Sequence, residues 1–557
     1  MAENDIPKER LEDLVARQNA ILSKIQNYFS PEEEETRRTK LVKVIAKVGS
    51  IVVITVSGIF GAAELGIFLF EQYKVRALAS DYAQVGKTLL YEENNAEVSK
   101  QFVGKALELT PDNSEFLKLD AYIDGMAAVR DLYNLDRPYN AAELKRAYEA
   151  LAKSELLRTQ APRSPEPYIL RGQIYAALKD YSRARSMLKK AIEINPKNDF
   201  ALMRLGAVAY SAGDRKAAIS YLNKAIVFNP KSKWAHLWLG IISSESKDFD
   251  TAETLKWFEK ALEIDPRFDL AHYNIAWNYL RQKPRNYEMA EKSFRQALAL
   301  NPDYKEAVYG LAMAYGYQRK YKIAHSYLSR AIEIDPLFLT GWKWRAIVND
   351  EMKAYDESLS DFSEAIKLDP ANSNIYMRRA RVYTKKKSYN EAMEDLLLAK
   401  SLNPKNPRIS FYLSRIYRDL GQLEAALSTV NKALELRAKY ADAYGLRAEI
   451  KVLQKDYSQA YSDFQKAIDS TSYRQERFLN KRAAVYFKQN KTEKALEDYT
   501  RVTKLAPQNA TAWLGLTRIY VQVGAKDKAE LSLSEFVKLK PNNPNVNQLR
   551  QKISSMK

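Results

Sequence analysis

Aromatic and basic side chains recur at helical spacing from residue 234 onward, and their chemistry is that of binding rather than bond cleavage. Aromatic rings offer broad apolar contact area, and guanidinium groups hold carboxylates through paired hydrogen bonds. The aromatic set is Trp234, Trp238, Tyr273, Trp277, Tyr309, Tyr317 and Trp344, and the basic set is Arg378, Arg381, Lys385, Arg408, Arg415, Arg418, Lys481, Lys488 and Arg518. An aromatic floor followed by a basic trough would suit an extended peptide with apolar anchors and an acidic end, or an anionic glycan.

Groups that could carry out catalysis are few. The chain has three histidines, His236, His272 and His325, and no cysteine, which excludes disulfides, thiol catalysis and thiolate metal sites. No HExxH zinc motif, nucleophile elbow, phosphate-binding loop or GxGxxG dinucleotide motif occurs in a suitable context. We therefore expect a protein that is not an enzyme and that holds no metal and no cofactor.

The net charge of +19 is unevenly distributed along the chain. Residues 371–557 hold 35 lysines and arginines against 18 aspartates and glutamates, a balance of +17, so the first 370 residues carry only +2. A basic region favours an anionic partner, such as an acidic protein face, a phosphate, an anionic polysaccharide or membrane headgroups. A solvated, lysine-rich helical surface has the same composition, and both interpretations stay open.

A single apolar run is long enough to cross a membrane. Residues 49–70 read GSIVVITVSGIFGAAELGIFLF, close to the roughly 20 residues that a helix needs to span the hydrocarbon layer. Basic residues crowd positions 37–47, whereas only Lys74 and Arg76 follow closely, so the positive-inside rule keeps the N-terminus in the cytoplasm. A cleaved signal peptide is the alternative, because residues 77–79 read ALA, but the long lead before the span favours an uncleaved anchor.

Two features of this span predict that it packs against another helix. Gly58, Ala62 and Gly66 recur every four residues and place small side chains on one helix face, while Glu64 is a carboxylate within the hydrocarbon. Chance and the nearness of Glu64 to water would account for the same residues. Residues 11–29 carry an apolar stripe typical of a short coiled coil or of an amphipathic helix on the inner leaflet. A homodimer through both segments is therefore a further prediction.

The rest of the chain repeats one short pattern. The segments KAIEINP, KAIVFNP, KALEIDP, QALALNP, RAIEIDP, EAIKLDP and LAKSLNP end at Pro196, Pro230, Pro266, Pro302, Pro336, Pro370 and Pro404. Equivalent points follow at Ala438, Ser472, Pro507 and Pro541, so the successive spacings are 34, 36, 36, 34, 34, 34, 34, 34, 35 and 34 residues. A fixed period of this length predicts a stack of helical units that share a continuous core.

Each unit reads as two amphipathic helices joined by a turn. In the unit that closes at Pro230, Leu202, Leu205 and Ala209 mark the first helix, and the Gly213-Asp214 turn precedes the second. Glycine or alanine recurs in the first helix (Gly172, Gly206 and Gly240 in three successive units) and again just after the turn. We expect small residues at these places because the two helix axes must approach to about 8–10 Å.

This pattern resembles the tetratricopeptide repeat, with eleven units from Pro165 to Pro541. The resemblance implies a right-handed α-solenoid whose concave wall is formed by the first helix of each unit. The aromatic and basic sets fall at places that would then face the groove, although the aromatic residues could instead pack between neighbouring repeats. Family members that bind chaperone C-termini use a clamp of lysine, asparagine and arginine, and that clamp is not recognisable here, where Asn274 alone occupies a suitable place.

The sequence therefore predicts five segments. They are a cytoplasmic segment (1–36), a membrane anchor (37–73), divergent helical repeats (74–162), the repeat superhelix (163–541) and a C-terminal capping helix (542–557). We expect a single-pass scaffold that binds a protein partner, with its repeats outside the cytoplasm, in the periplasm of a bacterial inner membrane, serving envelope assembly, secretion or a surface polymer. The alternative is a cytosol-facing receptor resembling mitochondrial import receptors. Nucleic acid conflicts with the predicted side of the membrane.

Overall fold

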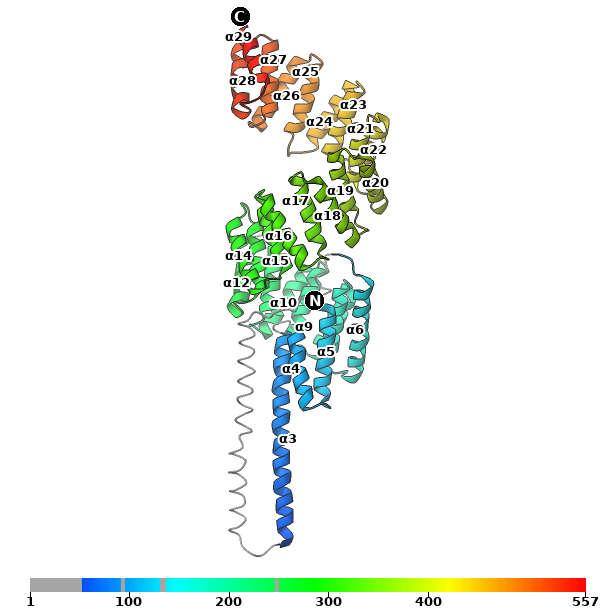
Figure 1. The fold of residues 1–557 in the computed structure, drawn as a ribbon, viewed down its shortest axis with the longest axis vertical. Helices are drawn as coiled ribbons and strands as arrows, with labels where there is room; N and C mark the ends of the chain where they lie inside the picture. Colours follow the sequence, from blue (N-terminus) through cyan, green and yellow to red (C-terminus); the bar gives the residue numbers. More distant parts are fainter. Residues whose placement is uncertain (1–52, 92–95, 131–136, 246–249, 557) are drawn as a thin grey trace. The chain divides into compact units, whose positions relative to one another are not determined.

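The computed structural model describes residues 53–91, 96–130, 137–245 and 250–556, with side chains from residue 72 onward except those of residues 128–130 and 160. Every element in these ranges is an α-helix (Figure 1). The helices are α3 (Val53–Tyr91), α4 (Ala96–Leu109), α5 (Ser114–Arg130), α6 (Ala141–Gln160), α7 (Glu166–Ala177), α8 (Tyr181–Ile194), α9 (Asp199–Ser211), α10 (Arg215–Phe228), α11 (Lys233–Ser244), α12 (Thr251–Ile264), α13 (Asp269–Arg281), α14 (Tyr287–Leu300), α15 (Lys305–Tyr317), α16 (Tyr321–Ile334), α17 (Leu339–Glu351), α18 (Tyr355–Leu368), α19 (Ser373–Lys386), α20 (Tyr389–Leu402), α21 (Pro407–Asp419), α22 (Leu423–Leu436), α23 (Ala441–Leu453), α24 (Tyr457–Asp469), α25 (Glu476–Lys488), α26 (Thr492–Leu505), α27 (Ala510–Gln522), α28 (Lys526–Leu539) and α29 (Asn545–Ser554).

From α7 to α16, and again from α19 to α28, the helices form successive antiparallel pairs, and each pair packs on the next. Local signals set the ends of the helices. The Asn198 and Asp214 side chains accept hydrogen bonds from the backbone N–H groups at the starts of α9 and α10, and the chain turns extended at Asn195 and Asn229, just before the periodic prolines. The expected all-α repeat solenoid is thus confirmed for the described residues.

Close approach within a pair depends on the small residues of the first helix. A Cβ on Gly206 would lie 2.7 Å from Leu222, and one on Gly240 would lie 2.4 Å from the Phe258 ring. The alanines after the turn, such as Ala218, are fully buried. Small side chains therefore let the aliphatic or aromatic residue of the second helix fill the space between the axes.

The turn between paired helices places one residue in the left-handed region. Gly213, Gly421 and Gly524 stand there with φ of 84°, 75° and 75°. Six other repeats hold a residue with a side chain at the same place, with φ between 54° and 65°, namely Lys179, Arg319, Lys353, Lys387, Lys455 and Asn490. Each of these residues carries a conformational cost that glycine avoids.

Replacing Lys387 by glycine is therefore expected to raise the free energy of unfolding by up to about 1 kcal/mol, because glycine adopts positive φ without strain. The matched control is Lys400→Gly, at an exposed site inside α20, which should lower it by about 1 kcal/mol. Chemical denaturation followed by circular dichroism measures both. A loss of stability in both variants would show that the left-handed backbone conformation of Lys387 does not lower the stability of the parent protein.

The described chain divides into two compact units, unit 1 up to Gly341 and unit 2 from Trp342. Their paired helices are held together differently. In unit 2, an arginine of the first helix binds an aspartate of the second through two hydrogen bonds in four repeats, whose pairs are Arg345–Asp361, Arg379–Asp395, Arg447–Asp463 and Arg482–Asp498. The corresponding places in unit 1 are apolar in α9 and α10, with Leu205 and Tyr221.

The C-terminal helix α29 closes the stack. Its Val546, Leu549 and Ile553 cover Leu533 and Phe536 of α28. Phe536 stands where other repeats have a small residue, and it is 2 % exposed. The larger ring is accommodated because the last pair faces a single helix rather than another repeat.

Upstream, α3 and α4 pack together and α5 packs on both α4 and α6 (Figure 1). The second half of α3 belongs to the core, since Ala79, Tyr82 and Leu90 are buried against α4 and α5. No helix of the described residues is long and apolar enough to cross a membrane. The predicted coiled-coil segment (11–29) and the side chains of Gly58, Ala62, Glu64 and Gly66 lie outside the described residues, so those predictions stay untested.

Candidate functional site: a groove along the first helices of unit 1

A cavity of about 550 Å³ lies along five successive first helices of unit 1. The helices α7, α9, α11, α13 and the start of α15 each contribute two or more lining residues. Three residues of the predicted aromatic set, Trp234, Trp238 and Tyr273, line it together with Leu237 and Ile241. The structure therefore brings these three aromatic residues to one concave surface.

The other members of the aromatic set lie elsewhere. Trp277 packs edge-on against the fully buried Phe294 and lies 6.1 Å from Tyr309, whose ring in turn meets Phe338. These two residues thus pack between repeats, which is the alternative that the sequence left open. Tyr317 is 41 % exposed at the end of α15, where the Arg285 guanidinium lies 4.5 Å from its ring centroid. Trp344 belongs to unit 2.

The groove combines apolar rings with charges of both signs. Arg204 of α9 lies over the Phe200 ring at 5.0 Å, Lys179 approaches from the turn after α7, and Glu306 stands at the start of α15. Burial raises the pKa of Tyr273 to about 12, so its hydroxyl stays protonated and can donate a hydrogen bond. Such a surface can hold apolar side chains, with Lys179 as a positively charged group at one end.

Reasoning from sequence missed several groove residues. Arg204, Leu237 and Glu306 occupy the same repeat places as the chosen aromatic and basic residues, and applying those places to every residue type would have found them. Tyr139 could not be found in this way. It precedes α6, outside the regular repeats, and its hydroxyl donates a hydrogen bond to the Ala177 carbonyl.

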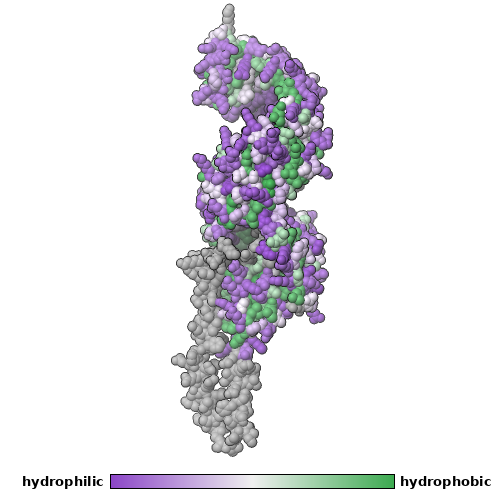
Figure 2. All heavy atoms as spheres, turned by 45° about the vertical axis from the view of Figure 1, so that its right-hand side comes forward, coloured by the Kyte–Doolittle hydropathy of each residue, from purple (hydrophilic) through white to green (hydrophobic). Residues whose placement is uncertain are grey.

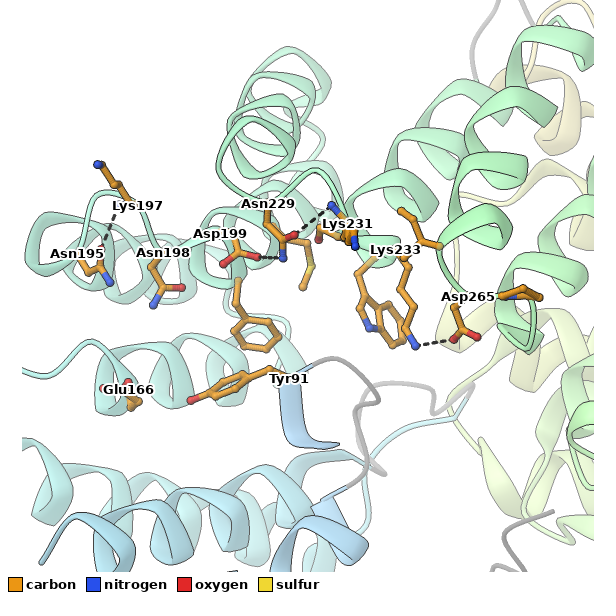
Figure 3. A pocket seen from close by; sticks show the side chains of 16 residues that line it. Tyr91, Glu166, Asn195, Lys197, Asn198, Asp199, Asn229, Lys231, Lys233 and Asp265 are labelled. Atoms are coloured by element: carbon orange, nitrogen blue, oxygen red, sulfur yellow. Dashed lines mark hydrogen bonds and ion pairs between the residues drawn. The ribbon is translucent and has the colours of Figure 1, made fainter. Parts of the chain in front are cut away.

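A second cavity, of about 710 Å³, lies at the edge where one repeat passes to the next (Figure 3). Its polar groups bind one another: Asn229 donates to Asp199 at 2.8 Å, and the Lys233 ammonium lies 2.6 Å from the Asp265 carboxylate. The Tyr91 ring at the end of α3 packs edge-on against Phe200 at 4.9 Å. These contacts tie neighbouring repeats together, so we assign this cavity to the architecture.

The basic set lies on first helices of unit 2, and three of its nine members are neutralised there. Lys385 binds Asp350, and both Arg418 and Lys481 bind Glu449. The partners come from neighbouring first helices, so acidic and basic residues alternate across repeats. Arg378, Arg381, Arg408, Arg415, Lys488 and Arg518 have no acidic partner within 4 Å among residues 342–556.

His236 and His272 serve the repeat architecture. Each donates its Nε2–H to the carbonyl of the periodic proline six residues earlier, Pro230 at 3.2 Å and Pro266 at 3.4 Å. Tyr376 and Trp513 make the same bond in other repeats, to Pro370 and Pro507. Different side chains thus satisfy one carbonyl where the chain leaves one repeat and enters the next. Among the described residues, no cluster of histidines and carboxylates could hold a metal ion.

Acid is expected to destabilise unit 1 through these histidines. Burial is the main cause that lowers the pKa of both below the ordinary value of 6.5, so the folded state resists protonation that the unfolded state accepts. Their contribution is present above about pH 6.5 and is lost as the pH falls below it. Denaturation between pH 7.5 and 5.5 measures the loss, and the variant His236→Tyr/His272→Tyr, which copies Tyr376, should show a smaller one. An equal loss in both proteins would contradict this origin.

On the face shown in Figure 2, hydrophilic residues predominate and hydrophobic ones gather in smaller patches between them. A stack of helix pairs with a groove along its first helices defines the chain as a helical-repeat scaffold. Family models described as tetratricopeptide repeat match residues 165–198, 200–232, 273–336, 309–372, 373–406, 408–440 and 486–553, together more than half of the chain. The chain therefore belongs to the tetratricopeptide repeat family.

Two solved structures are similar to this chain. Yeast Tom70 shares 18 % sequence identity, with a TM-score of 0.41, and the likeness covers 80 % of this chain and 96 % of Tom70. A tetratricopeptide repeat protein from Parabacteroides merdae shares 18 % identity, with a TM-score of 0.37, and the likeness covers 45 % of this chain and 99 % of that one. No curated protein sequence matches the chain.

Proposed function

We propose that the chain is a scaffold without enzymatic activity that holds an extended segment of a partner protein in the groove of unit 1. The observation that supports this most is the cavity itself, because five first helices in a row leave Trp234, Trp238 and Tyr273 partly exposed along it. Partly exposed aromatic rings in a concave surface are typical of protein-binding sites, since burying them on association is favourable.

The elongated shape of the groove favours a peptide over a flat protein surface. Lys179, in the turn after α7, places a positive charge at the earlier end of the cavity. An extended segment that carries an acidic residue at that end would pair with it. Apolar anchor side chains further along the segment would lie against the three aromatic rings.

Capture of the partner by the full chain tests this proposal. The variant Trp238→Ala/Tyr273→Ala is expected to retain less than about a tenth of the partner, because aromatic anchors contribute about 2 kcal/mol or more each. The control Phe228→Ala changes an aromatic residue, 44 % exposed, at the end of α10 and outside the groove, and should retain all of it. Equal recovery by the two variants, with matching thermal stability, would exclude the groove as the binding site.

We further propose that the apolar run of residues 49–70 anchors the chain in a membrane and that the repeats lie outside the cytoplasm, where they would organise an envelope assembly, secretion or surface-polymer complex. Two sequence features support this proposal, namely the length of the run and the excess of basic residues before it. The absence of cysteine permits a direct test with a single introduced thiol.

Ser472, exposed between α24 and α25, can be replaced by cysteine and probed in intact cells with a membrane-impermeant maleimide, after permeabilising any outer layer. Labelling before lysis is expected if the repeats lie outside the cytoplasm. Labelling only after lysis would reverse the topology and favour a cytosol-facing receptor.

A further inference from the structure

Three arginines of unit 2 lie together without acidic partners. Arg378 and Arg381 belong to α19, and Arg408 stands at the start of the next first helix, α21. Arg378 is close enough to the other two for their charges to act on it. The Arg381 guanidinium lies 5.7 Å from the centroid of the Tyr412 ring, which belongs to α21 as well.

This arrangement is unfavourable in the free protein. Burial lowers the pKa of Arg378 most, and the positive charges of Arg381 and Arg408 lower it further. Tyr412 and Asp350 oppose these effects, but the Asp350 carboxylate is already bound to the Lys385 ammonium at 2.5 Å. Arg378 and Arg381 of α19 and the exposed Arg408 of α21 thus lie near one another, and none of the three forms an ion pair with an acidic residue among residues 342–556.

The arginines of unit 2 that join the two helices of a repeat each bind an aspartate. Arg379, the residue next to Arg378, binds Asp395 through two hydrogen bonds of 2.8 and 2.7 Å. Arg345, Arg447 and Arg482 bind aspartates in the same way. Because the repeat readily accommodates such aspartates, the lack of one beside Arg378, Arg381 and Arg408 indicates a site that an outside anion completes.

We propose that Arg378, Arg381 and Arg408 form an oxyanion site that binds a partner peptide carrying a concentrated negative charge of about −2, from a phosphorylated side chain or two adjacent carboxylates. Guanidinium groups suit both anions because their paired N–H donors match carboxylate and phosphate oxygens. This inference rests on the proposed function, in that the ligand belongs to a protein, but it concerns a different surface from the groove of unit 1.

The test uses the full chain and three fluorescein-labelled peptides of sequence GSGXXGSG, in which XX is Asp-Asp, phosphoserine-Gly or Asn-Asn. Fluorescence anisotropy should show binding of one or both anionic peptides and none of the Asn-Asn peptide. The variant Arg378→Gln/Arg381→Gln/Arg408→Gln should weaken this binding by about tenfold or more. The control Lys400→Gln/Lys405→Gln/Lys439→Gln removes the same charge from exposed sites of unit 2 and should change it less than about twofold.

Thermal unfolding provides a second readout. The arginine variant should unfold at the same temperature as the parent or higher, because it removes like-charge crowding, whereas a lower temperature would mean that the arginines serve folding. Failure of the parent to bind either anionic peptide, or equal losses in the two triple variants, would overturn the proposal. The groove variant Trp238→Ala/Tyr273→Ala should bind the anionic peptides normally. A failed test of the groove in unit 1 would therefore leave this oxyanion site standing, and a failed test of this site would leave the groove proposal standing.

Discussion

Replacing Gly310 by alanine is expected to destabilise unit 1 by about 2–3 kcal/mol, as overpacking of a close-packed core does. The added Cβ would lie 2.2 Å from the Phe294 ring, and that ring is fully buried between α14 and α15, so it has no space to withdraw. Hydrogen exchange of the α14 and α15 amides measures the effect where it arises, which matters because a long repeat array need not unfold in one step.

Gly316, six residues further along α15, provides the matched control. A Cβ there meets nothing within 4 Å, so Gly316→Ala should stabilise the helix by up to about 1 kcal/mol. The two substitutions are chemically identical and lie in one helix. If both variants exchanged faster than the parent, the loss would not depend on the close approach of Phe294, and the packing account of the small residues would be wrong.

Replacing Asp463 by alanine is expected to destabilise unit 2 by about 3–4 kcal/mol. The Asp463 side chain is 1 % exposed and accepts hydrogen bonds of 2.8 and 2.7 Å from Arg447, whose own side chain is 22 % exposed. Its removal leaves a largely buried guanidinium whose remaining bond is to Asn431. Chemical denaturation of the full chain measures the loss.

The repeat formed by α21 and α22 supplies the control for this pair. It has Leu413 and Thr429 where its neighbours have arginine and aspartate, and Leu413 is 2 % exposed. The double variant Arg447→Leu/Asp463→Thr introduces the residue types of that repeat. Its free energy of unfolding should lie within about 1 kcal/mol of that of the parent. A double variant as unstable as Asp463→Ala would show that the ion pair itself, rather than the unpaired charge, determines stability.

Sequence alone predicts the architecture because each of the features that define it lies within a single repeat. The prolines, the glycine or alanine at fixed places and the capping Asn198 and Asp214 act over a few residues, so periodicity reveals them. The Arg–Asp pairs also carried a signal, since arginine and aspartate stand 16 residues apart in four repeats. The pairing was not predicted, because none of these four arginines belongs to the basic set.

The functional surface was predictable only in part, because it depends on distances between repeats. Trp238 and Trp277 both fall at first-helix places that were expected to face the groove, yet Trp238 lines the groove and Trp277 packs against Phe294. Arg418 was expected to be a free groove cation, but Glu449 from the next first helix binds it. The period locates a residue on its helix, whereas its neighbours follow from how closely successive helices pack.

The central claim is that an extended polypeptide lies in the groove of unit 1, and site-specific photo-crosslinking tests it most directly. A photo-reactive amino acid is placed at Asn274, which lines the groove without belonging to its aromatic floor, and at Val227, which is 75 % exposed on α10 and outside the groove, as the control. We predict that Asn274 crosslinks in cells to one contiguous segment of a partner protein and that Val227 does not. Equal crosslinking at both sites, or products at Asn274 scattered over unrelated surfaces, would contradict the account.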